Sequence, residues 1–208
     1  MPGTKGKQTR RRLIEAARAL FREKGYQGVS IREIARAAKI REASLYYYAP
    51  GGKEDLYVEV VKLDLDWYEK GVREVIQKAE PSAQAQLHAV AAWLLAQPPP
   101  PLFRLFETDV QFLSTENRER LLSQLFESLY APLAAVFRNA QIRGELRAVD
   151  PLLLATQFLA ALIGVQHSQA ARLLTGDAPS LASQTVDIFL HGLAPPPEQE
   201  EPPANAET

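Results

Sequence analysis

The chain has 208 residues, 46% hydrophobic and 24% charged, a balance typical of a globular protein long enough to bury a sizeable core. It contains no cysteine, which excludes a disulfide framework and thiolate chemistry and suits a reducing cytoplasm. The net charge of −1 hides a segregation of sign, because residues 1–53 carry 13 Lys and Arg against 4 Glu, and the remainder carries 11 basic and 21 acidic residues. A basic N-terminal quarter is the electrostatic footprint expected of a compact nucleic-acid-binding module, and a solvated basic surface is the alternative.

Apolar positions three and four apart predict a first helix that runs to about Lys24, where Gly25 supplies the expected stop. Residues 10–12, three arginines, are expected in or near its first turn. Cations there oppose the helix dipole by roughly a few tenths of a kcal/mol each, so contact between Arg10 and a DNA phosphate is one explanation. The alternative is a helix that begins earlier, near Lys7. The N-terminus has no apolar h-region, so no secretory signal is predicted.

The stretch from Ser30 to Tyr48 predicts two short helices joined by a tight turn. Ser30 and Glu33 form a capping-box pattern at the start of the first. The second is expected over about Arg41 to Tyr47, with Leu45 as its inward anchor. Two helices this short have too little buried surface to be stable alone, and such a pair typically places its second helix in the major groove of DNA.

The same residues resemble the TetR family of transcriptional regulators. The resemblance lies in Leu45-Tyr46-Tyr47, the loop Tyr48 to Gly52 and the run Lys53 to Leu56. Upstream, it extends to the pairs Ala16-Ala17, Leu20-Phe21, Gly25-Tyr26 and Ile34-Ala35. It covers about the first quarter of the chain, and beyond Leu56 it is only a similarity in helix number and in the final helices.

The chain departs from the family pattern in the turn. Lys39 stands where the family usually has glycine, and Arg41 stands where it usually has a serine or threonine cap. A non-glycine residue at positive φ costs roughly 1 kcal/mol, so the sequence leaves open whether this turn is copied or rebuilt. Tyr48 and Ala49 also replace a common histidine and phenylalanine, and the Pro-Gly-Gly loop is one residue longer.

The expected DNA contacts fall into two groups. Base edges would be read from the second short helix, where arginine pairs with guanine, a glutamate accepts from cytosine and alanine touches a thymine methyl. These residues are Arg41, Glu42, Ala43, Ser44 and Tyr47. Phosphates would be held by Ser30, Arg32, Tyr48 and Lys53, together with Arg10. Tyr46 is expected to pack inward at least partly and is assigned no base.

A long helix is predicted from Lys53 to about Ala79, joining the N-terminal helices to the rest of the chain. Its apolar stripe is expected along Leu56, Val60, Leu63, Trp67, Gly71 and Val75. Its free N-terminal N–H groups, beside Lys53, would suit a phosphate. Asp64 and Asp66 are expected to face water.

Further helices are predicted over Gln84 to Gln97, about Glu116 to Arg143 with a kink at Pro132, Pro151 to Ala171, and Ser180 to Gly192. Between the first two lies a four-proline run followed by an aromatic segment. Asp150-Pro151 forms a cap-and-first-turn signal. The proline-rich, acidic tail, residues 195–208, is predicted to be disordered.

Residues 151–171 carry no charge over 21 positions, which is long enough for a membrane span. Polar residues such as Gln157 and Gln166 and the lack of a basic flank favour a buried helix instead. A membrane-associated helical protein is thus the weaker alternative. The resemblance implies that this helix and the last one form a two-fold intersubunit four-helix bundle. The expected interface residues are Leu159, Ala160, Gly164, His167, Leu181, Thr185, Ile188 and Phe189.

An enclosed apolar pocket is expected to take a small ligand in the C-terminal part. Its candidate lining is Trp67, Trp93, Phe103, Phe106, Phe112, Phe126 and Phe158, with Arg104 for an anionic head group such as a carboxylate. Each aromatic residue has packing in the core as its alternative, and Arg104 has solvent. This pattern favours an amphipathic ligand.

The sequence contains no GxSxG, GxGxxG, P-loop or HExxH motif, and His88, His167 and His191 are scattered, so neither an enzyme, a metal site nor a cofactor is predicted. The expected fold is all-α with about nine helices: a helix-turn-helix domain (1–52), a helical ligand-binding and dimerisation domain (53–194) and the tail (195–208). The predicted function is a cytoplasmic, homodimeric, sequence-specific DNA-binding regulator, a repressor released from a palindromic operator by a small molecule. The alternatives are a transcriptional activator and a ligand-binding dimer without DNA binding.

Overall fold

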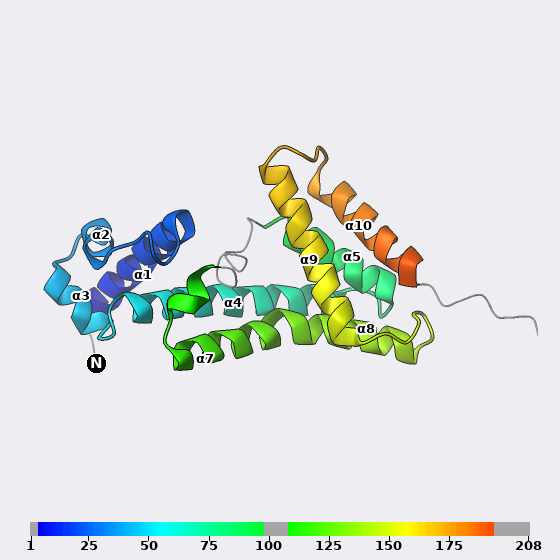
Figure 1. Ribbon diagram of the computed structural model, residues 1–208, viewed down its shortest axis with the longest axis horizontal. Coiled ribbons are helices and arrows are strands. Elements are labelled where there is room, and N and C mark those ends of the chain that lie inside the picture. Colours follow the sequence, from blue (N-terminus) through cyan, green and yellow to red (C-terminus); the bar gives the residue numbers. More distant parts are fainter. Residues whose placement is uncertain (1–3, 98–107, 194–208) are drawn as a thin grey trace, which may run out of the picture. The chain divides into compact units, whose positions relative to one another are not determined.

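The computed structural model describes residues 4–97 and 108–193, and in these ranges every regular element is a helix, as predicted for an all-α chain (Figure 1). The described residues form two compact units, one of residues up to 74 with 97–131 and the other of residues 75–96 with 132 onward. Helix α4 (Lys53–Lys78) contributes to both. The boundary at residue 52 between a DNA-binding and a ligand-binding domain therefore stays a prediction. The predicted tail, residues 195–208, lies outside the described residues.

The first unit contains the helix-turn-helix. Its elements are α1 (Thr4–Lys24), α2 (Ile31–Ala37), α3 (Glu42–Tyr48), the first part of α4, the short 3-10 helix η2 (Val110–Phe112), α7 (Thr115–Leu125) and the π-turn η3 (Phe126–Tyr130). The side chains of Leu13, Ala17, Ile34 and Leu45 are fully buried. These four residues hold α1, α2 and α3 together, because each helix alone offers too small an apolar face.

Helix α1 begins at Thr4, earlier than the main prediction. Residues 10–12 therefore lie beyond the first turn, and the expectation that three arginines oppose the helix dipole there was wrong. Gly25 ends the helix with a φ of 72°, as predicted for a C′ glycine.

The turn between α2 and α3 has a lysine in a backbone conformation that favours glycine. Lys39 adopts a φ of 56°, in the left-handed region where glycine is favoured. Ser30 and Glu33 form the predicted capping box, and hydrogen bonds from Lys24 and Ser30 lower the pKa of Glu33 to about 2. Arg41 occupies the N-cap of α3 without a side-chain hydrogen bond. The backbone at Lys39 therefore has the left-handed conformation and is strained.

We expect Lys39→Gly to stabilise the protein by about 1 kcal/mol, because glycine removes the clash of Cβ in this conformation. Lys39→Ala is the matched control, since it removes the charge but keeps Cβ. Urea unfolding of the three proteins gives the comparison. Equal midpoints for the glycine and alanine variants would show that the backbone at this position carries no strain.

Asp64 was expected to face water, but its side chain is only 3% exposed, so this prediction was wrong. It accepts a hydrogen bond from Arg18, and Arg22 lies 3.9 Å from its other carboxylate oxygen. Burial lowers the pKa of the Arg18 guanidinium. This ion-pair cluster fastens α1 to α4, and Asp66 remains exposed as expected.

The predicted apolar stripe of α4 is only partly right. Leu56 and Val60 are buried, but Leu63 and Trp67 are 43% and 46% exposed. Leu65, Tyr68 and Val72 take the buried positions further along the helix. The three- and four-residue spacing predicted a helix correctly, but it did not show which face of that helix its neighbours would cover.

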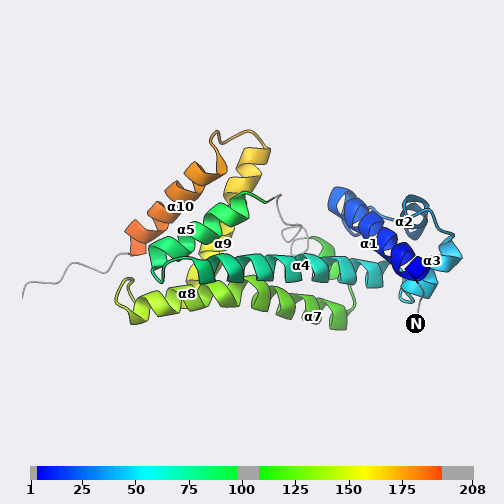
Figure 2. The same ribbon diagram turned by 180° about the vertical axis from the view of Figure 1, so that it is seen from behind.

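The second unit contains α5 (Ala83–Leu95), α8 (Ala131–Ile142), α9 (Pro151–Ala170) and α10 (Ala178–Leu193). Helices α5, α9 and α10 lie side by side in both views (Figures 1 and 2), and α10 packs chiefly on α5. Phe137 and Phe158 are fully buried and meet edge to face, 6.1 Å apart. Asp150 caps α9 as predicted, accepting from the Leu152 N–H at 2.8 Å.

The helix predicted from Glu116 to Arg143 is present as α7, η3 and α8 in sequence, and Gly144 ends it with a φ of 74°. The π-turn ends at Tyr130, two residues before Pro132, which has no N–H for the carbonyl of Ser128. The expected irregularity at this proline is therefore found as a π-turn.

Helix α9 is, by length and composition alone, apolar enough to cross a membrane, and it is the one such helix among the described residues. A helix in the core of a globular unit passes the same test. Phe158, Leu159 and Leu162 are buried, and the Gln166 amide donates to the carbonyl oxygen of Leu94 at 2.8 Å. These contacts are those of a core helix.

Candidate nucleic-acid interface

Helix α3 presents the predicted base-reading residues at the surface. Leu45 is fully buried and anchors the helix, whereas Tyr47 is 76% exposed. Arg41, Ala43 and Ser44 are exposed, and Glu42 is half-buried. The rings of Tyr47 and Tyr48 meet edge to face with centroids 5.1 Å apart. The structure thus brings the predicted readers together on one short, rigid element.

Tyr46 is 47% exposed, so its inward packing is partial, as expected. A side chain at Gly52 would meet the Tyr46 ring at 3.5 Å. The ring therefore covers the loop that leads into α4, and this position supports leaving Tyr46 out of the base-reading group.

Two predicted contact residues, one from each group, are paired with each other. The Arg32 Nε atom on α2 lies 3.2 Å from Oε2 of Glu42 on α3. The side chains of Arg32 and Glu42 are 83% and 43% exposed, so water screens this ion pair and it contributes little to stability. The ion pair does orient the Glu42 carboxylate. To accept a hydrogen bond from a cytosine, this carboxylate has to break the ion pair or keep only one oxygen on Arg32.

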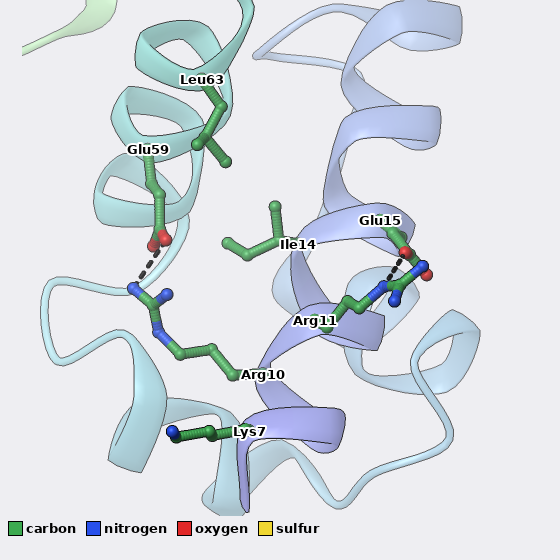
Figure 3. Close-up of a pocket in the computed structure, with 7 residues that line it drawn as sticks. All are labelled: Lys7, Arg10, Arg11, Ile14, Glu15, Glu59 and Leu63. Atoms are coloured by element: carbon green, nitrogen blue, oxygen red, sulfur yellow. Dashed lines mark hydrogen bonds and ion pairs between the residues drawn. The ribbon is translucent and has the colours of Figure 1, made fainter.

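The N-terminal part of α1 lies beside α3 in both views (Figures 1 and 2). Figure 3 shows Arg10 reaching from α1 to Glu59 on α4, with a separation of 2.6 Å. Ile14 and Leu63 lie between the two helices, in an open groove of about 390 Å³. Arg10 is therefore at the right end of the molecule for a phosphate, but Glu59 competes for its guanidinium.

We expect Glu59→Gln to raise operator affinity about threefold at low salt, because it frees Arg10 and removes a negative charge near the phosphates. Glu69→Gln is the matched control, since Glu69 also lies on α4 and pairs with an arginine, Arg73, 2.9 Å away. Fluorescence anisotropy at several salt concentrations measures the effect. Equal affinities for the two variants would place Arg10 away from the phosphates.

The start of α4 carries an acidic side chain beside the N–H groups that were expected to suit a phosphate. The Asp55 carboxylate accepts from the N–H of Gly51 at 2.5 Å, so an acidic side chain already covers this end. The Lys53 ammonium lies 4.3 Å from the centroid of the Tyr26 ring. Any phosphate here would be held by Lys53 rather than by the helix end, because Asp55 repels it.

The predicted ligand residues that the structure describes differ in burial. Phe158 is core, with Phe137 and Phe189 against it. Trp67, Phe112 and Phe126 are 46%, 44% and 41% exposed, and Trp93 is half-buried. Phe103, Arg104 and Phe106 lie outside the described residues. The ligand site therefore stays a prediction, and the burial of Phe158 favours core packing, the alternative given for each aromatic residue.

The predicted dimer residues divide by exposure. Leu159, Leu181 and Thr185 are at most 8% exposed and pack within their own unit, which corrects their assignment. Thr185 donates its hydroxyl hydrogen to the carbonyl oxygen of Leu181. Ala160, Gly164, His167 and Ile188 are exposed, and Phe189 is half-buried against Phe158. The four exposed residues remain available for a partner subunit.

Within the residues that the structure describes, no group of three or more His, Asp or Glu side chains is arranged to hold a metal ion. Three acids that sequence reasoning did not assign to any site have structural partners, namely Glu59, Asp64 and Asp109. Each partner is distant in sequence, so no local motif signals the contact.

A basic helix-turn-helix whose second helix is exposed has the architecture of a DNA-binding domain. Residues 13–60 match the family model of bacterial regulatory proteins, tetR family. The chain is 28% identical over 198 residues to the HTH-type transcriptional repressor KstR2 of Rhodococcus jostii, covering 93% of this chain and 95% of KstR2. Residues 13–60 thus form a DNA-binding domain of the tetR family, and the chain is a DNA-binding transcriptional regulator.

Solved structures with the same fold include two that hold ligands. AibR, in complex with isovaleryl coenzyme A and operator DNA, is 23% identical, covers 90% of this chain and 99% of its own, and has a TM-score of 0.68. FadR of Bacillus subtilis, in complex with stearoyl-CoA, is 18% identical, covers 88% of this chain and 98% of its own, and has a TM-score of 0.72. At these identities the likeness concerns the fold.

Proposed function

We propose that this protein is a cytoplasmic, dimeric repressor that binds a palindromic operator and is released from it by a small amphipathic ligand. The observation that supports the proposal is the exposed surface of α3. Leu45 fixes this short helix, and Tyr47, two residues later, is 76% exposed. Arg41, Ala43 and Ser44 are exposed on the same helix or its cap. This is the surface that a helix-turn-helix inserts into the major groove.

Release by a ligand follows from geometry. In a dimer the two α3 helices have to lie about 34 Å apart to reach successive major grooves, so a ligand that prefers another spacing lowers operator affinity. To shift the population from 1:99 to 99:1, the ligand needs about 5.5 kcal/mol of differential affinity. The acyl-CoA thioesters held by AibR and FadR support an amphipathic ligand for this chain as well.

The proposed subunit contact is the exposed face of α9 and α10. A side chain built at Gly164 would have nothing within 4 Å, so this face is open in the single chain. Ile188 is 74% exposed, so this face presents an apolar side chain that a second copy would cover. Small residues such as Ala160 and Gly164 let a partner helix approach closely.

We expect Ile188→Asp to dissociate the dimer, raising its dissociation constant at least about tenfold, because an unpaired charge would be buried at the contact. Ile142→Asp is the matched control, since Ile142 is equally exposed at 77% and lies on α8. Analytical ultracentrifugation over a range of concentrations measures both. Dissociation by the Ile142 variant alone would place the interface elsewhere.

Operator binding and its release by ligand are tested on one labelled duplex, which is first selected from a random pool by its binding to the wild-type protein. Wild-type protein is bound to this duplex at controlled salt, and isovaleryl-CoA, stearoyl-CoA, free stearate and free coenzyme A are added in turn. The proposal expects at least one acyl compound to release the DNA while coenzyme A alone does not. Release by none of them would reject the amphipathic ligand, and failure of the wild type to bind would reject the regulator.

A further inference from the structure

Asp109 links three separate parts of the first unit. Its carboxylate is only 5% exposed and accepts from the Tyr26 N–H at 3.2 Å and from the Tyr57 O–H at 2.8 Å. Tyr26 follows the glycine that ends α1, Tyr57 lies on α4, and Asp109 directly precedes η2. One buried carboxylate therefore fixes the end of α1 against α4.

The contact surface around this carboxylate is aromatic. The Tyr26 and Tyr57 rings meet at 5.0 Å, and Phe21 meets Tyr57 at 5.1 Å. Lys53, predicted to hold a phosphate, has its ammonium 4.3 Å above the Tyr26 ring. A shift of Asp109 would thus move both the end of α1 and the ring on which Lys53 lies.

Glu54 makes a second link, between the first turn of α4 and the start of α7. Its Oε1 atom accepts from the Ser114 N–H at 2.8 Å, from the Ser114 hydroxyl at 2.6 Å and from the Asn117 amide at 2.7 Å. These hydrogen bonds, chiefly that from the Ser114 hydroxyl, lower the pKa of Glu54. The carboxylate is thus ionised and held from α7.

Asp109 and Glu54 together, the two-carboxylate clamp, accept five hydrogen bonds from groups far apart in sequence. Hydrogen bonds to ionised groups are roughly twice as strong as neutral ones, and a buried acceptor that loses its donors is costly. The position of residues 109–117 therefore determines where α1 and the first turn of α4 can lie. Arg104 and Phe106, predicted for ligand contact, precede this segment closely in the chain.

We propose that Asp109 and Glu54 are positioning residues, through which the segment 109–117 sets the orientation of the helix-turn-helix on α4 and thereby the operator spacing that the dimer accepts. This inference rests on the proposed operator binding and adds the residues that control it.

The clamp is tested first without DNA, by hydrogen exchange at the Tyr26 amide in Tyr57→Phe and in Asp109→Asn. Phenylalanine keeps the ring but removes one donor, and asparagine keeps the shape but has a single acceptor oxygen. We expect exchange at Tyr26 to speed up about tenfold, the effect of losing roughly 1.4 kcal/mol of local stability. Tyr130→Phe is the control, because it removes a half-buried tyrosine hydroxyl from η3.

The second measurement compares two duplexes, the selected operator and the same operator with one extra base pair between its half-sites. Loss of the clamp in Glu54→Gln or Tyr57→Phe should reduce the ratio of the two dissociation constants at least threefold, because a looser domain tolerates the wrong spacing. Glu119→Gln, an exposed carboxylate change on α7, should leave the ratio unchanged.

Unchanged exchange at Tyr26 in both variants, or weakening of both duplexes by one common factor, would overturn the clamp. If a variant merely lowers the amount of folded protein, its apparent dissociation constants for the two duplexes rise by the same factor. A change in their ratio therefore reports positioning rather than stability. Failure of the proposed function is a different result, since it is seen as a wild-type protein that selects no duplex.

Discussion

Replacing Tyr47 by alanine is expected to weaken operator binding by about ten- to a hundredfold, because a good base contact is worth roughly 1–3 kcal/mol. Stability should change by no more than about 0.5 kcal/mol, since the side chain is 76% exposed. An anisotropy titration at fixed salt gives the affinity, and urea unfolding gives the stability.

Tyr47→Phe separates the hydroxyl from the ring and should retain part of the affinity if the ring contacts a base or sugar. Lys53→Ala should also weaken binding, but with a smaller salt slope, because it removes a phosphate contact. Alanine variants of Tyr47 and Lys53 that both bind at the wild-type affinity would contradict the assignment of this surface.

Replacing Asp64 by alanine is expected to destabilise the protein by about 2 kcal/mol, because removal of one partner leaves the Arg18 charge uncompensated. The effect should stay below the full cost of a buried pair, since the Arg18 side chain is 41% exposed and water screens it. Urea unfolding followed by circular dichroism measures the change.

Asp66→Ala is the matched control for Asp64, as Asp66 lies two residues away on α4 but is exposed. We expect it to cost less than about 1 kcal/mol, the loss of one hydrogen bond from Gln124. The double variant Arg18→Met/Asp64→Leu should recover part of the loss, since an apolar pair needs no compensating charge. Equal costs for the two single variants would show that the buried ion pair does not fasten α1 to α4.

Much of the fold follows from local signals. The Ser30 capping box, the Gly25 stop and the Asp150 cap each predicted a helix end that the structure confirms, because capping depends on residues within one turn. The exposed face of α3 could be predicted for the same reason, since Leu45 alone had to point inward.

Contacts between distant segments could not be predicted. Asp64 looked like a surface residue because nothing near it in sequence shows that Arg18 meets it from α1. Asp109 is recognised only when the fold brings Tyr26 and Tyr57 to it. The stripe through Leu63 and Trp67 failed because spacing alone does not show which face of the helix is covered, and the segments packed on α4 bury Leu65, Tyr68 and Val72 instead.

Selection of bound sequences from a random duplex pool at low, fixed salt shows whether a dimer reads DNA through α3. We expect enrichment of one inverted repeat, with half-site centres about one helical turn or a multiple of it apart, and loss of that enrichment in Tyr47→Ala. A pool that stays random, or one that yields a single half-site without symmetry, would contradict a dimer that reads an operator through α3.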